Sequence, residues 1–329
     1  MTLREQHFSN VLRSRGVAVL LSLCAMWLTW QSVASGRVSA PPAPESVVFK
    51  VGRDWLAAFP ELSCAVNLVC LVAVASMMVM VNKLFNLLRT MSVFFAGFFI
   101  VACCCTPVVA GYVGTDSLLA IVVLACMWLM FSIYSERICT RRVCMVFALL
   151  TGAATLDYHF LLYLPVFFVA LGQMRVLRFK TVLAAVLGIA APLWIVYGAG
   201  LAPWPEMPRF FLTSPRLLLE LNGGLPFVAA VGFTLLLGFS MWLLNILRIL
   251  SFNARDRAYN GLLLLIGVAT SLYAVVNFTY LPFYVTLLNA CVAFQVGLFF
   301  RYTASRRGYI YILLMLASYF GLYFWQTYS

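Results

Sequence analysis

The sequence predicts an all-α, polytopic membrane protein, a single transmembrane domain of about eleven helices covering residues 1–329. Three observations predict it. Apolar residues make up 64% of the chain, charged residues only 10%, and the mean hydropathy is +1.00, whereas soluble domains are about 45–50% apolar and about 25% charged. The apolar runs are long and continuous, which favours helices over the alternating strands of an outer-membrane barrel. A soluble enzyme, a disordered chain and a nucleic-acid-binding protein are therefore excluded.

The helices follow from the apolar runs, because a helix needs about 20 mostly apolar residues to cross about 30 Å of hydrocarbon. Two external segments are long enough to carry structure of their own, residues 35–62 and 201–224, and in each we expect a short interfacial helix. The expected spans are 16–34, 63–81, 91–110, 117–134, 143–157, 159–173, 181–200, 225–247, 261–276, 282–300 and 309–326.

The first expected helix has two interpretations. Arg13 and Arg15 precede an apolar core, and Val33, Ala34 and Ser35 follow it, as in a signal peptide with a small-residue cleavage site. The run is long for a signal core, which favours an uncleaved helix. Cleavage would leave ten spans.

The basic residues predict the orientation. Of the 22 Lys and Arg residues, 17 fall in one set of alternating connections and five in the other. By the positive-inside rule, the N-terminus is cytoplasmic and, with eleven spans, the C-terminus is external. The net charge of +12 then indicates orientation and contact with anionic lipid head groups rather than a polyanionic substrate.

Ten cysteines do not indicate a metal or redox site. Eight lie inside apolar runs, where cysteine behaves as a small hydrophobic residue, and Cys139 lies in a cytoplasmic loop. Cys64 lies near the outer interface, within reach of the run Cys103 to Cys105, so a disulfide there is an open alternative. No CxxC motif occurs and the chain has two histidines, so we expect no metal and no cofactor.

The strongest candidate site is the turn between the fifth and sixth spans, where Asp157 and His159 are candidate catalytic residues. Each half of this hairpin has about 14–16 residues, roughly 21–24 Å, and falls short of a full span. In one interpretation the tip is recessed and His159 acts as a general base whose partner is Asp157. In the other, the helices extend by snorkelling and the turn is solvated. Because residues two apart on a helix do not face each other, the pair requires a turn that folds back.

The external segments supply candidate substrate-binding residues. Arg209 and Arg216 could hold a phosphate or pyrophosphate, Trp204 could stack on a sugar ring, and Asp54 could act with another external carboxylate. The alternatives are a solvated loop and an interfacial aromatic belt.

Polar residues inside the expected spans are explained by hydrogen bonds between helices. Because no carboxylate is expected in mid-span, an ion-coupled transporter is less favoured. These polar residues are Asn67, Asn245, Asn277, Asn289 and Gln295.

Five short segments carry a resemblance to a known family, namely Asn82 to Asn86, Arg89-Thr90, Gly152 to Tyr158, Arg175 to Arg178 and Gly188 to Pro192. They resemble a family of uncharacterised polytopic inner-membrane proteins of Bacteroidota, a domain of unknown function. The resemblance covers residues 50 to 200 and implies a bacterial inner membrane. More distantly, paired short helices and polar outer loops are similar to membrane glycosyltransferases and polysaccharide polymerases and ligases, which act on lipid-linked sugars.

Three functions remain open at this level. The first is a non-enzymatic component of cell-envelope biogenesis with membrane-protein partners. The second is an enzyme that transfers or polymerises a lipid-linked glycan at the outer face, and the third is a transporter or flippase. The bilayer itself is the partner common to all three, and no nucleic-acid partner is expected.

Overall fold

The computed structural model describes residues 14–38, 59–88, 93–136, 138–200, 224–249, 252–302 and 306–328. Within these ranges every regular element is a helix. The elements are α2 (Arg15–Ala34), α4 (Pro60–Phe85), α5 (Phe94–Cys104), α6 (Pro107–Ala110), α7 (Thr115–Ser132), α8 (Thr140–Ala154), η1 (Tyr158–Leu162), α9 (Tyr163–Gln173), α10 (Phe179–Leu193), η2 (Trp194–Gly198), α12 (Gly224–Ile249), α13 (Ala254–Val276), η3 (Phe278–Tyr280), α14 (Leu281–Tyr302) and α15 (Arg306–Tyr328).

Eight of the described helices are long and apolar enough to cross a membrane, fewer than the eleven spans expected. They are α2, α4, α7, α10 with η2, α12, α13, α14 and α15. The other three expected spans are helical but short. The expected span 91–110 is divided, because Pro107 cannot continue the ladder of α5 and instead begins α6. The halves of the hairpin are α8, with 15 residues, and η1 with α9, so the expected shortness is confirmed.

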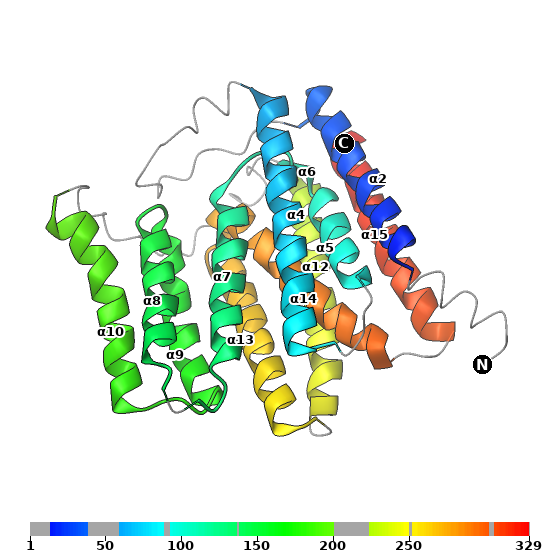
Figure 1. The fold of residues 1–329 in the computed structure, drawn as a ribbon. Coiled ribbons are helices and arrows are strands. Elements are labelled where there is room, and N and C mark those ends of the chain that lie inside the picture. The colour runs from blue at the N-terminus through cyan, green and yellow to red at the C-terminus, as the bar shows by residue number, and fades with distance from the viewer. Residues whose placement is uncertain are drawn as a thin grey trace.

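The bundle is built around α14, which is the most deeply packed of the eight long helices, with 94% of its apolar window buried. Helices α5, α7, α12 and α13 pack directly against it. In Figure 1, α10 lies at one edge and α2 and α15 lie at the other. These three helices are the most exposed of the eight, as expected for helices that face lipid.

Successive helices run in alternating directions, so the bundle has two distinct ends (Figure 1). We call the end where α2, α8, α10 and α13 begin the basic end. Among the residues whose side chains are described, it carries nine basic residues and two acidic ones. The opposite end carries one basic residue and three acidic ones. The basic nine are Arg15, Lys83, Arg141, Arg142, Arg175, Arg178, Lys180, Arg255 and Arg257.

The first helix is integrated into this bundle. Ser14 caps α2 by accepting a hydrogen bond from the backbone N–H of Val17. Thr29 of α2 donates to the carbonyl of Cys104 at 2.9 Å, and Tyr323 of α15 donates to the carbonyl of Leu28 at 2.7 Å. All ten cysteines are free thiols, so the structure contains no disulfide between Cys64 and the run that ends α5.

Candidate functional site

The turn between α8 and η1 brings Asp157 and His159 together. Asp157 has extended backbone angles and caps η1, because its Oδ1 accepts the backbone N–H of His159 at 3.1 Å. The same oxygen is 2.8 Å from His159 Nδ1. The chain therefore folds back as the pair requires. The two residues are 1% and 0% exposed, so the pair is buried in packed protein rather than solvated.

Two other helices complete a hydrogen-bonded chain. Thr115, in the first turn of α7, donates to Asp157 Oδ2 at 3.2 Å. Asn277, at the end of α13, places its Nδ2 3.0 Å from His159 Nε2. Because an amide nitrogen only donates, Nε2 accepts this bond, and Nδ1 therefore carries the proton that is donated to Asp157. Both nitrogens of the imidazole are therefore engaged in hydrogen bonds.

Aromatic rings cover the imidazole. Tyr158 stacks on it with ring centroids 4.2 Å apart, and Tyr280 lies 4.4 Å away on a tilted plane. The rings of Phe283 and Tyr284 of α14 also lie near the imidazole, with centroids 5.4 and 6.3 Å from its centroid. The histidine is thus enclosed by protein on the faces that these rings cover.

A second buried carboxylate lies in the same part of the bundle. Asp116, directly after Thr115, is 5% exposed and accepts a hydrogen bond from Thr286 of α14 at 2.5 Å. It lies in the first turn of α7, where the helix dipole favours a negative charge. Asp116 directly precedes the span 117–134 that the sequence predicts. Its position after Gly114 and Thr115, at the start of an apolar run, was the available signal of a helix N-terminus.

Asn67 of α4 connects this region to the neighbouring helices. Its Nδ2 donates to the carbonyls of Val109 and Ala110, both at 3.0 Å, and its Oδ1 accepts from Ser117 at 2.7 Å. Interhelical hydrogen bonds for this polar residue are therefore confirmed.

The remaining polar residues of the spans behave in the same way. Asn245 Nδ2 donates to Gln295 Oε1 at 2.5 Å, and Asn289 Nδ2 lies 3.5 Å from Cys103 Sγ. Asn245 and Gln295 also line a pocket between α12, α13 and α14, toward the basic end. Its volume is about 10 Å³, about the space that one water molecule needs.

The four predicted substrate-binding residues, Asp54, Trp204, Arg209 and Arg216, lie outside the described residues, as do the interfacial helices expected near them. Within the described ranges, no three His, Cys, Asp or Glu side chains gather as a metal site. The structure therefore brings together the two predicted catalytic residues. It adds Thr115, Asn277 and Asp116, which the sequence did not associate with them.

Comparisons of the chain with protein-family models, with curated proteins and with solved structures find no match.

Proposed function

We propose that this multi-pass membrane protein resides in a bacterial cytoplasmic membrane and serves as a non-enzymatic component of cell-envelope biogenesis. The resemblance to inner-membrane proteins of Bacteroidota supports the location. The excess of exposed cations at the basic end supports a cytoplasmic N-terminus. The hydrogen bonds of α2 to α5 and α15 support a first helix that is kept rather than cleaved.

One observation carries the non-enzymatic role, namely that the atom a general base would use is already occupied. If Asp157 orients the imidazole through Nδ1, Nε2 is the atom that would take a proton from a substrate. Asn277 donates to this atom, and Tyr158 and Tyr280 cover the ring. A structural role needs no movement of these groups.

A membrane enzyme that acts on a lipid-linked glycan is the second candidate. The specific observation in its favour is the hydrogen bond between Asp157 and His159, the base-and-orienter arrangement of many catalytic sites. An ionisable pair buried in a membrane protein is also costly enough to indicate a function. In this alternative Arg209 and Arg216 hold the pyrophosphate, and Asn277 moves aside when the substrate binds. A transporter is less favoured, because the helix at the centre of the bundle, α14, is almost completely packed.

The test is a pull-down of the tagged protein from its native membrane, with the surface glycans of each strain analysed in parallel. The strains carry wild type, a deletion, the Asp157→Asn/His159→Ala variant, or the control Tyr163→Phe/Thr270→Val. The control removes a neighbouring buried hydrogen bond, 3.1 Å between the two hydroxyls, without changing the candidate pair.

We expect a partner to co-purify from all three expressing strains, glycans to change in the deletion strain, and both point variants to keep wild-type glycans. Glycans that shorten only in the Asp157/His159 variant, while the protein and its partners are retained, would establish the enzyme instead. An unchanged envelope in the deletion strain would refute a role in its biogenesis.

A further inference from the structure

Two connections at the basic end are joined into one corner of the molecule. The α7–α8 connection and the α9–α10 connection meet where the backbone N–H of Ser135 donates to the carbonyl of Met174 at 3.0 Å. Ser135 and Arg175 both adopt positive φ angles, 58° and 59°, to make these turns. Thr181 stabilises the α9–α10 connection, because its hydroxyl donates to the carbonyl of Val176 at 2.8 Å.

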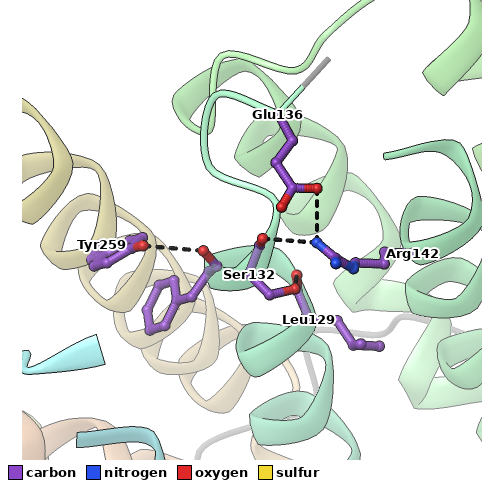
Figure 2. Close-up of polar contacts among 6 residues, drawn as sticks. Leu129, Ser132, Glu136, Arg142 and Tyr259 are labelled. Atoms are coloured by element: carbon purple, nitrogen blue, oxygen red, sulfur yellow. Dashed lines mark hydrogen bonds and ion pairs between the residues drawn. The ribbon is translucent and has the colours of Figure 1, made fainter. Parts of the chain in front are cut away.

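The same corner is held to the end of α7 by Arg142. Its Nη1 donates to the carbonyl of Ser132 at 2.9 Å and to Glu136 Oε2 at 2.8 Å (Figure 2). From the other side, Tyr259 of α13 donates to the carbonyl of Phe131 at 3.1 Å. Glu136 is therefore neutralised by Arg142.

Helices α8 and α10 pack closely, and both begin at the basic end. Thr151 of α8 donates to the carbonyl of Gly188 at 3.1 Å, and Gly188 lies so close to α8 that a Cβ there would be 2.5 Å from the carbonyl oxygen of Cys144. Their first turns therefore lie in the same corner of the molecule, with the start of α10 beyond that of α8 in Figure 1. Arg141 on α8 and Lys180 on α10 are both exposed in this corner.

The corner combines cations with exposed apolar side chains. Arg141, Arg142, Arg175, Arg178 and Lys180 give it five of the nine described cations of the basic end, against one carboxylate, which Arg142 already binds. Ile138, Leu177 and Phe179 are 89%, 55% and 83% exposed, and the last two alternate with Arg178 and Lys180 along the chain. Such side chains at the end of a membrane helix enter the boundary between head groups and acyl chains.

We propose that this corner is a binding site for an anionic phospholipid, with Arg141, Arg175 and Lys180 on the phosphate group and Leu177 and Phe179 against the glycerol and upper acyl chain. Charge complementarity selects this occupant, because a cluster of cations beside a membrane helix attracts anionic head groups. The arginines match the phosphate geometry, since a guanidinium donates two parallel hydrogen bonds.

The other four described cations of the basic end are spread over α2, α4 and α13. Arg255 and Arg257 flank Asp256 at the start of α13, and Arg255 lies over the ring of Tyr259 at 5.7 Å. Lys83 stands on the last turn of α4. These three exposed residues provide a control with an equal loss of charge.

The experiment measures the melting temperature of the full chain in detergent as phosphatidylglycerol or phosphatidylcholine is added. The test variant is Arg141→Gln/Arg175→Gln/Lys180→Gln, and the control is Lys83→Gln/Arg255→Gln/Arg257→Gln. We expect phosphatidylglycerol, but not phosphatidylcholine, to raise the melting temperature of wild type and control. The test variant should need about 100-fold more phosphatidylglycerol for the same shift. Added salt should weaken the response of wild type.

An equal loss of response in the test and control variants would overturn the site and indicate a diffuse basic surface. A wild-type response to phosphatidylcholine as strong as that to phosphatidylglycerol would also overturn it. If the triple variant does not fold, the single variant Lys180→Gln and the charge-preserving pair Arg141→Lys/Arg175→Lys are compared. The site requires Lys180→Gln to weaken the response. The lysine pair keeps both charges but loses the paired hydrogen bonds, so it should weaken the response less than Arg141→Gln/Arg175→Gln does.

Discussion

Replacing Asp157 by alanine should destabilise the protein far more than replacing it by asparagine. The carboxylate accepts three hydrogen bonds, from the backbone N–H and the Nδ1 of His159 and from the hydroxyl of Thr115. Alanine leaves these donors without their acceptor in a region where both residues of the pair are at most 1% exposed. A buried donor left unpaired costs about 1–3 kcal/mol. Because such costs are not additive, we expect a total loss of about 3–5 kcal/mol.

Asparagine keeps most of this arrangement. Its Oδ1 can still accept both hydrogen bonds from His159, and the hydroxyl of Thr115 can rotate to accept from the new Nδ2. The expected loss is therefore about 1 kcal/mol, the net value of one neutral hydrogen bond.

The measurement is equilibrium unfolding in mixed micelles, followed by tryptophan fluorescence, with Tyr163→Phe as the control for loss of one ordinary buried hydrogen bond. Alanine and asparagine variants that unfold at the same denaturant concentration as wild type would refute the reasoning, because water would then be satisfying the turn. Large and equal losses of unfolding free energy in both variants would also refute the reasoning, since they would show that the negative charge of Asp157 itself stabilises the fold.

Three further predictions use other parts of the bundle. Gly188→Val should displace α10 from α8 and cost about 1–3 kcal/mol, whereas Gly152→Val, where nothing lies within 4 Å of an added Cβ, should cost much less in the same unfolding assay. Asn67→Leu should cost about 1–3 kcal/mol, because it breaks three buried hydrogen bonds; a wild-type unfolding midpoint would contradict this. Arg142→Ala should cost less than about 1 kcal/mol, because the side chains of its ion pair with Glu136 are 43% and 40% exposed; a larger loss would show that the contact to Ser132 dominates.

The sequence could predict the helices and the short hairpin because hydrophobic length and charge are local properties. The interhelical bonds of Asn67 and Asn245 were predictable for a similar reason, since a polar side chain in an apolar span requires a partner. The identity of that partner was not. Asn277 and Thr115 reach the His159 turn from α13 and α7, and apolar helix faces contain little information about which helices pack together. The break at Pro107 could have been expected from proline geometry alone.

The shortness of the hairpin gives a physical reason for the polar cluster at its tip. A helix of 15 residues is about 22 Å long, and in Figure 1 the tip of α8 stops below the start of α4. The turn lies level with the start of α7 and the end of α13, whose residues Thr115 and Asn277 contact it. Because Asp157 and His159 are buried there, the backbone groups of the turn are shielded from water and require partners from the protein. Asp157 satisfies the N–H of His159, and Tyr273 donates to the carbonyl of Leu162 at 2.7 Å.

On this account the acid and the histidine are needed to close a turn, whatever else the protein does. Replacing Asp157 by asparagine therefore distinguishes the two candidate functions. A turn-closing carboxylate tolerates its amide isostere, whereas a catalytic base loses its orienting charge with the same substitution. The Asp157→Asn variant, stable and with unchanged glycans, is therefore the result that only the structural role predicts.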